Sequence, residues 1–305
     1  MPISNFFHDR LTALLDYVES RNHWNGPGRE LGRQTFQQNL AQPGFDPENN
    51  CWLLEDGGKV KGFCLVNREP PINRAVLQMD VDPSSAGSTE EKELLRLAVD
   101  SCSRWGAQVA HICQSADSPR NALLGSLGFS HVRTYTVMDW QGETLPDVPA
   151  AQGFQVTPFS EGDHALLTQV QNDAFGGSWG FCPNTVDQIK YRIAMADTST
   201  GGILFLRNGE KTAGHCWTCI SPIPAGIRGA IGMIGVVPEY RGQGISSSIL
   251  SAGMRYLKSI DVQEIGLEVD SSNTPAIRLY TSVGFRKVAD LHWFELELSR
   301  FDNSR

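Results

Sequence analysis

The chain has 305 residues, of which 40% are hydrophobic and 20% are charged. These values are typical of globular proteins and exclude disordered, collagen-like and membrane-embedded classes. No apolar run reaches the roughly 18 residues that a membrane-spanning helix needs. The net charge of -8 argues against broad binding to nucleic acid or to an anionic membrane, because both need a surface rich in Lys and Arg.

The N-terminal residues lack the basic start and apolar stretch of a secretory signal, so we expect a cytoplasmic protein. The seven cysteines are odd in number and scattered, which does not favour a disulfide framework. Cys216 and Cys219 form the one close pair, inside an apolar run. Without a second Cys or His pair, this spacing favours two strand residues over half a zinc site, and we expect no metal.

An internal repeat runs through the chain. In the first half, an apolar strand ends in Pro83, Asp117 begins an Asp-Ser-Pro segment, and a Leu-Gly-Phe segment follows. In the second half, a strand ends in Pro238, Asn273 begins an Asn-Thr-Pro segment, and a Val-Gly-Phe segment follows. A repeat on this scale indicates two homologous domains.

The segment 141–153 separates the two copies. It is rich in Pro and Gly and poor in periodic apolar residues, which is typical of a linker. The sequence therefore predicts an N-terminal domain over residues 1–140 and a C-terminal domain over residues 154–305.

Apolar periodicity predicts the elements of the second half in chain order. Strands are expected near 154–159, 203–207, 212–220, 230–237, 265–269 and 285–298. Helices are expected near 162–175, 185–196 and 245–260, with a short helix between Pro275 and Gly284. Three antiparallel strands followed by strand, helix, strand, helix and strand make a mixed α/β domain, and the first half repeats this pattern more loosely.

The densest candidate for chemistry is the segment 236–246. A strand stops at Pro238, and Gly242 and Gly244 precede a helix start, which leaves several backbone N–H groups directed at one point. These donors and the positive end of the helix dipole suit a phosphate or pyrophosphate, and Arg241 adds a cation. A strand-to-helix turn that merely needs glycine is the open alternative, and no nucleotide P-loop string occurs.

Two motifs in this half resemble the GNAT superfamily of acetyl-CoA-dependent N-acyltransferases. The family hallmark, Gln/Arg-x-x-Gly-x-Gly/Ala, is matched by Arg241 and Gly244, with Ser246 in place of the last Gly or Ala. The second motif is an Asn after a strand, followed by a helix that carries Tyr and ends in Gly-Phe. It is matched by Asn273 and Tyr280.

The resemblance implies an α/β (α+β) fold of two tandem GNAT domains, each a mostly antiparallel mixed sheet flanked by helices. It covers residues 154–298 directly and residues 1–140 through the repeat. In the first half, Ala86 and Thr89 stand where the loop has its Arg and second glycine, so we expect a degenerate, catalytically silent domain. A degenerate domain followed by an intact one resembles tandem GNAT proteins of the mycothiol synthase type.

The resemblance also implies acetyl-CoA as co-substrate. The pantetheine arm would follow the strand that ends near residue 237, and the pyrophosphate would lie on the loop after it. The predicted cofactor-binding residues are Val236, Val237, Arg241, Gly242, Gln243, Gly244, Ile245, Ser246 and Asn273.

Tyr280 is the predicted general acid, because a phenol pKa of about 10 lies near the thiol value of about 8.5. A packing role is the alternative for this Tyr. The general base is open, since the strand 230–237 carries no carboxylate. Glu268 is the catalytic candidate on a neighbouring strand, and His215 and Asp270 are further possibilities.

Acceptor recognition is predicted for Trp179 and Phe181, in the aromatic, glycine-rich segment 175–183, and for His215. Packing of this segment on the other domain is the alternative. The expected acceptor is the primary amine of a small molecule, attacking directly in a ternary complex, with the protein a monomer or homodimer. Two other functions stay open: a non-catalytic acyl-CoA-binding or scaffold protein, and a peptide or protein N-acetyltransferase.

Overall fold

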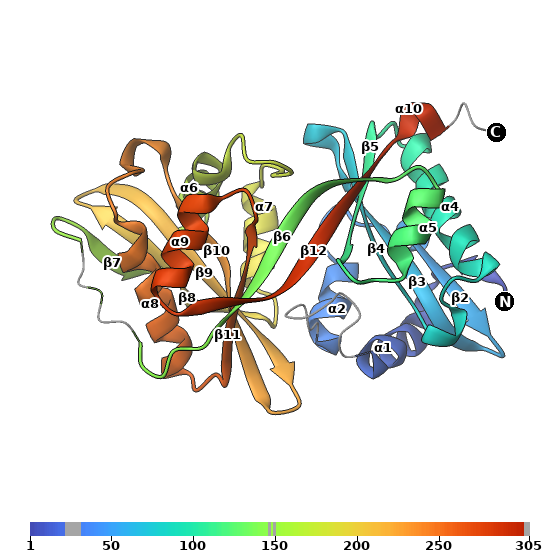
Figure 1. Ribbon diagram of the computed structural model, residues 1–305, viewed down its shortest axis with the longest axis horizontal. Coiled ribbons are helices and arrows are strands. Elements are labelled where there is room, and N and C mark those ends of the chain that lie inside the picture. The colour runs from blue at the N-terminus through green and yellow to red at the C-terminus, as the bar shows by residue number, and fades with distance from the viewer. Residues whose placement is uncertain (22–31, 146–147, 149–150, 302–305) are drawn as a thin grey trace. The chain divides into compact units, whose positions relative to one another are not determined.

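The computed structural model describes residues 1–21, 32–145, 148 and 151–301 (Figure 1). The chain divides into two compact units: unit 1 comprises Met1–Tyr135 and Ala289–Arg305, and unit 2 comprises Thr136–Val288. Residues 146–147 and 149–150 of the predicted linker lie outside the described residues. Among the helices that are described, none is both long and apolar enough to cross a membrane.

Unit 1 has the strand order β1-β2-β3-β4-β5-β12, in which only β4 and β5 are parallel among the paired neighbours described. Its strands are β1 (Ile3–Asn5), β2 (Cys51–Asp56), β3 (Lys59–Glu69), β4 (Arg74–Val81), β5 (Val109–Ser115) and the second half of β12 (Phe285–Glu297). Its α-helices are α1 (Leu11–Ser20), α2 (Arg33–Leu40), α3 (Pro47–Asn50), α4 (Thr89–Arg104), α5 (Arg120–Ser126) and α10 (Leu298–Phe301).

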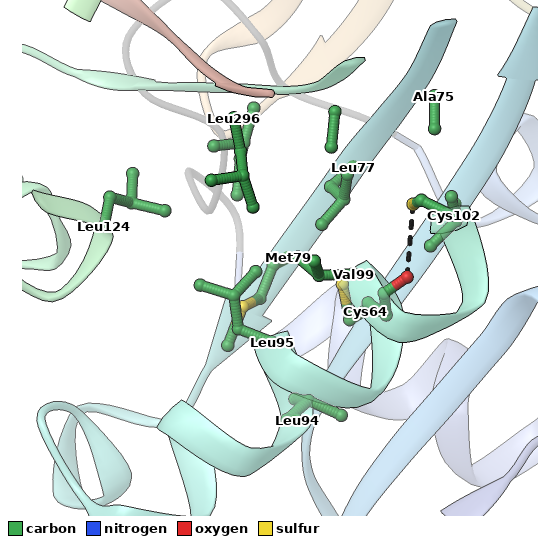
Figure 2. Packing of buried hydrophobic residues seen from close by; sticks show 14 of the residues in the cluster. Cys64, Ala75, Leu77, Met79, Leu94, Leu95, Val99, Cys102, Leu124 and Leu296 are labelled. Carbon is green, nitrogen blue, oxygen red and sulfur yellow. Dashed lines mark hydrogen bonds between the residues drawn. The ribbon is translucent and has the colours of Figure 1, made fainter. Parts of the chain in front are cut away.

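The sheet of unit 1 buries both faces, as the alternation along β3 shows. Cys64 and Val66 pack in the cluster that contains α4, whereas Phe63 and Leu65 pack with α1 and α2. Successive side chains of a strand point to opposite faces, so this near-continuous apolar run serves two cores. Figure 2 shows the α4 side, with Leu95 and Val99 of the helix facing Leu77 and Met79 of β4.

The C-terminal segment 289–305 belongs to unit 1, whereas the predicted division assigned it to the C-terminal domain. Leu291–Glu297 of β12 pair antiparallel with Val109–Ser115 of β5. Phe294 and Leu296 are buried in the same cluster as α4. Strand β12 therefore completes the sheet and the core of unit 1, although most of unit 1 lies far from it in the sequence.

Unit 2 has the strand order β11-β10-β9-β8-β7, and the second half of β6 (Ser130–Trp140) neighbours β11. Its other strands are β7 (Gln155–Pro158), β8 (Thr198–Asn208), β9 (Lys211–Ile223), β10 (Gly226–Val236) and β11 (Glu264–Asp270). Its helices are α6 (His164–Phe175), α7 (Val186–Ile193), α8 (Ser246–Ser259) and α9 (Thr274–Ser282), with a 3-10 turn at Pro238–Tyr240. The mixed α/β prediction and its order of elements are confirmed.

Helices cover both faces of the unit 2 sheet. Trp217 of β9 packs with Leu167 of α6 and Ile189 of α7. The adjacent Cys216 packs in the cluster of α8 and α9, which lie on the same side of the sheet in Figure 1. We call these two sides the α6 face and the α8 face. Cys219 packs against the α6-face cluster, so the thiols of the Cys216–Cys219 pair point to opposite faces.

The parallel strands β10 and β11 stay paired only from Arg228–Ile231, opposite Glu264–Leu267. Beyond this point, the described pairing of β10 continues with β9 alone, up to Val236. In unit 1, β4 and β5 pair over an equally short stretch, Arg74–Leu77 opposite Val109–Ile112. The sequence repeat therefore corresponds to a repeated fork between two parallel strands.

The placement of β12 leads to a stability prediction. Replacing Leu296 by Ala should lower the free energy of unfolding by about 2–5 kcal/mol, because it removes a buried side chain from the α4 core. Val288→Ala, at a position that is 44% exposed, should change it by less than about 0.5 kcal/mol. Urea unfolding of both variants measures this difference. Equal effects of the two substitutions would contradict the assignment of β12 to unit 1.

Candidate active site

The fork in unit 2 leaves one edge of β10 open to a ligand. The pairing with β9 shifts register between Ile231 and Met233, so Gly232 has no partner residue on β9. From there to Val236, the edge of β10 that faced β11 carries no described pairing. Backbone N–H and C=O groups need a partner, and an extended amide-containing chain could supply one along this edge.

The loop between β10 and α8 presents free backbone donors. Gly242 and Gly244 have left-handed φ angles of 76° and 72°, and a Cβ at either position would meet no atom within 4 Å. Helix α8 has Ile245 as its N-cap residue and no side-chain cap. In the described part of the chain, the N–H groups from Gly242 to Ser247 form no hydrogen bond. Such a cluster at a helix N-terminus suits an anion.

Arg241 braces this loop. Its Nε donates to the Val236 carbonyl at 3.1 Å, and its guanidinium donates to the Ala174 carbonyl at 2.9 Å, at the end of α6. A cation at a helix C-terminus is favourable, so the contact joins α6 to the end of β10. Gln243 likewise donates to the carbonyl of Glu239, at 3.3 Å. The predicted phosphate contacts of these two side chains stay predictions.

The predicted catalytic helix α9 lies on the α8 face. Asn273 accepts a hydrogen bond from the Ala276 N–H at 3.2 Å and so acts as the N-cap of α9. Tyr280 is 7% exposed and packs edge-on against Phe285. Burial, and secondarily the nearby Cys216 thiol, raises the pKa of Tyr280 well above its usual value. The phenol therefore stays protonated and can act only as a donor of its proton.

Two predicted acceptor residues meet on the α6 face through a shared neighbour. Phe175 stacks on Phe181 with ring centroids 5.6 Å apart, and its edge meets His215 at 6.1 Å. Trp179 is half-buried in the turn between Phe175 and Phe181. The structure therefore places His215 beneath an aromatic layer, out of contact with solvent, rather than at an exposed surface.

His215 is an unusual core residue. It has no exposed surface, and neither ring nitrogen finds a hydrogen-bond partner among the described residues. Burial lowers the pKa of His215 to about 4, so its imidazole is neutral at physiological pH. A neutral imidazole under Phe175 is poorly placed to remove a proton from an amine.

Glu268 occupies the other limb of the fork. It is the first residue of β11 after the last parallel pair, and it is half-buried. Its neighbours Leu267 and Val269 belong to the α8-face core, so strand alternation directs Glu268 to the α6 face. Asp270, the alternative base, accepts hydrogen bonds from the N–H and hydroxyl of Ser272 and so holds a turn.

Sequence reasoning missed Asp197, a half-buried carboxylate on the α6 face directly before β8. The predicted strand began at residue 203, whereas β8 begins at Thr198. Asp197 therefore fell in a stretch with no predicted element. No group of three or more His, Cys, Asp or Glu that could hold a metal ion is found in the described ranges.

The matching loop of unit 1 is satisfied by its own side chains. The Glu91 carboxylate accepts the Gly87 N–H at 2.6 Å and pairs with Arg120 at 2.7 Å. Arg120 also donates to the Met79 carbonyl of β4 and to Gln114 of β5, so it spans the fork. A cavity of about 620 Å³ adjoins this network. Among the described residues, the unit 1 loop therefore presents fewer free donors than the unit 2 loop.

Comparison with known proteins points to one family. Residues 165–285 match the model described as the acetyltransferase (GNAT) family. The chain is 27% identical to a mycothiol acetyltransferase of Thermobispora bispora over 289 residues, 90% of this chain and 92% of that protein. It is 28% identical to one from Thermomonospora curvata over 245 residues, 77% of this chain and 78% of that protein.

Solved structures show the same fold. A GCN5-related N-acetyltransferase from Sphaerobacter thermophilus has a TM-score of 0.74 at 18% identity, covering 97% of this chain and 95% of that chain. A tandem GNAT protein from the clavulanic acid biosynthesis pathway has a TM-score of 0.74 at 13% identity, covering 97% and 98%. At these identities the likeness supports the architecture alone.

The buried neutral His215 gives a pH-dependence prediction. Its pKa is lowered in the folded state, so its neutral form contributes stability above pH 6.5, and this is lost as the pH falls from 6.5 toward 4. The full loss amounts to about 3 kcal/mol. His215→Phe should flatten this part of the curve of unfolding free energy against pH, measured by denaturant unfolding. An unchanged curve would contradict the burial of a neutral ring.

Proposed function

Because residues 165–285 match the acetyltransferase (GNAT) family, we propose that the chain transfers the acetyl group of acetyl-CoA to the primary amine of a small molecule. The amine attacks the thioester directly, within a ternary complex. The observation that carries the proposal is the row of free N–H groups from Gly242 to Ser247, beside the open edge of β10. These two features suit a pyrophosphate and an amide-containing arm.

The residues present fit this co-substrate. The N–H groups of the loop would hold the pyrophosphate at the start of α8, and Ser246 is small enough for close approach. The edge of β10 from Met233 to Val236 would bond the two amides of the pantetheine arm, and the capping Asn273 would lie at the start of α9. Bound acetyl-CoA supplies an acyl carbon activated by its thioester sulfur.

The proposed reaction forms one bond and breaks another. The amine nitrogen forms a bond to the acyl carbon, and the carbon–sulfur bond breaks. Backbone N–H groups near the register shift at Gly232 stabilise the oxyanion, as in other acyl transfers. Glu268 takes a proton from the bound ammonium through water, and the neutral amine then attacks. As the intermediate collapses, the second proton leaves the nitrogen through water, Tyr280 gives its proton to the departing thiolate, and water reprotonates Tyr280. The acid and the base lie on opposite faces of the sheet.

The acceptor is proposed to be small. The relatives above carry the name mycothiol acetyltransferase, which supports a small-molecule acceptor over a peptide. In unit 2, Phe175 and the candidate acceptor residue Phe181 stack above the buried His215, and Trp179 lies in the same segment. An aromatic layer of this kind would contact the apolar part of a small amine.

Calorimetry and thiol release test the proposal together. Titration with CoA should give one site per chain, and free thiol should form from acetyl-CoA when a primary amine is added. Binding without turnover on any amine would favour a non-catalytic acyl-CoA-binding protein. No binding of CoA at all would overturn the proposal.

Gly244→Val should weaken CoA binding about tenfold or more. The new side chain is strained at a φ of 72° and stands in the space that the pyrophosphate needs. Gly209→Val is a matched control, because Gly209 has a φ of 60° and equally open surroundings in the β8–β9 turn. The control should lose stability without losing affinity in calorimetric titration. Equal affinities for CoA would remove the loop from the site.

Tyr280→Phe should lower kcat about 100-fold while leaving the dissociation constant of CoA nearly unchanged, because only the proton donor is removed. Tyr256→Phe serves as the control, since Tyr256 packs in the same α8-face core but lies on α8. Stopped-flow or steady-state thiol release gives kcat, and calorimetry gives the affinity. A Tyr280→Phe enzyme with normal turnover would leave this Tyr with a packing role only.

A further inference from the structure

Asp197 is a carboxylate to which the proposed mechanism gives no role. Its backbone carbonyl accepts the Ile220 N–H at 2.8 Å, which ties it to the end of β9. Its side chain accepts a hydrogen bond from the Thr198 hydroxyl at 3.3 Å and forms no ion pair with a described residue. Burial raises the pKa of this carboxyl above its usual range, and Arg192 of α7 partly opposes that effect.

A hydrogen-bonded relay fixes the orientation of the carboxylate. The indole N–H of Trp217 donates to the Thr198 hydroxyl at 3.3 Å, and this hydroxyl donates onward to Asp197. Trp217 is itself buried in the α6-face core. A carboxylate that is half-buried, oriented and without an ionic partner retains unused capacity to accept hydrogen bonds from a cation.

Asp197 and the register shift of β10 lie beside the same part of β9. Cys219 of β9 pairs with Ala230 on one side and with Thr198 on the other. The Cys219 sulfur lies 2.9 Å from the place where a Cβ on Gly232 would stand. Asp197 directly precedes Thr198, the partner of Cys219, and so lies at this end of β9. Burial first, and then the negative charge of Asp197, raises the pKa of the Cys219 thiol to about 12.

Asp197, Cys219 and Gly232 lie on the face of the sheet from which the amine would approach. Tyr280 lies on the α8 face, so the incoming nitrogen belongs on the α6 face, near the exposed Gly232. The strand 230–237 carries no carboxylate of its own. Met233 and Trp217 pack together on the same face and are apolar. A cationic amine with an apolar carbon beside its nitrogen matches these surroundings.

We propose that Asp197 binds the ammonium group of the acceptor beside Gly232, and so selects small primary amines that arrive as cations. The inference rests on the proposed function and deepens it. Asp197 thus positions the amine from β8, whereas Glu268 on β11 removes its proton. The titratable and charged groups that act on Asp197 from the elements around it are Arg192 of α7 and Cys219 of β9.

The test compares Asp197→Asn with Asp187→Asn, a control on α7 whose side chain is 87% exposed. Thiol release from acetyl-CoA is measured with 2-phenylethylamine, glucosamine and spermidine. Asp197→Asn should raise the KM for the best of these amines about tenfold or more, with a smaller change in kcat and an unchanged affinity for CoA. It should also reduce, without abolishing, the loss of kcat/KM at acid pH, because the carboxylate that would bind the ammonium is gone but the proposed base Glu268 remains.

Thr198→Val provides a second variant, because it removes the hydroxyl that orients the carboxylate but keeps the charge. It should raise the same KM by a smaller factor. A KM and an acid limb in Asp197→Asn equal to those of the wild type would overturn this inference alone, as would a parallel loss of CoA affinity. A wild-type protein that binds no CoA, or that acetylates none of the three amines, would instead count against the proposed function.

Discussion

The site depends on the short ladder between the parallel strands β10 and β11. The two strands pair over four residues, and Arg228 at the closed end is 5% exposed and paired with Glu264 and Asp139. Removing both carboxylates would leave the buried Arg228 guanidinium without these ionic partners, although Glu264 and Asp139 are themselves partly exposed. The ion pairs therefore hold the strands together at one end, while the other end stays open. The loop, α8 and α9 are all arranged around that open end.

Unit 1 has the same fork, with Arg74 at its closed end paired to Glu69, yet its polar groups are used differently. Its helix α4 is capped by Ser88, and Glu91 and Arg120 take up the N–H and carbonyl groups that a ligand would need. An anion at that place would have to displace a buried carboxylate. The fold is shared by both units, and the satisfaction of backbone donors is what separates them.

Features set by local sequence were predictable, and those set by distant partners were not. The loop glycines and the N-cap residue Asn273 affect only the backbone within a few residues of them, so the sequence was enough to predict them. The pairing of β12 with β5 joins segments far apart in the chain. Strand β8 was predicted too short because it contains Gly202, where a Cβ would clash with Thr218 and Tyr256. The close packing of α8 therefore requires glycine at position 202, and glycine weakens the sequence pattern that predicts a strand.

The two faces of unit 2 give the proposed acid, Tyr280, and the proposed base, Glu268, separate surroundings. Burial in the α8-face core raises the pKa of Tyr280, so on the proposed mechanism it would keep its proton until a strong base such as a thiolate forms beside it. On the α6 face, Glu268 and Asp197 are only half-buried, so water can reach a proton that leaves the amine there. Because the sheet lies between these groups, the amine's proton cannot pass straight to the acid. In the described part of unit 2, the opening between β10 and β11 is where an acyl group could face both sides, and on the proposed mechanism its carbonyl would lie at Gly232.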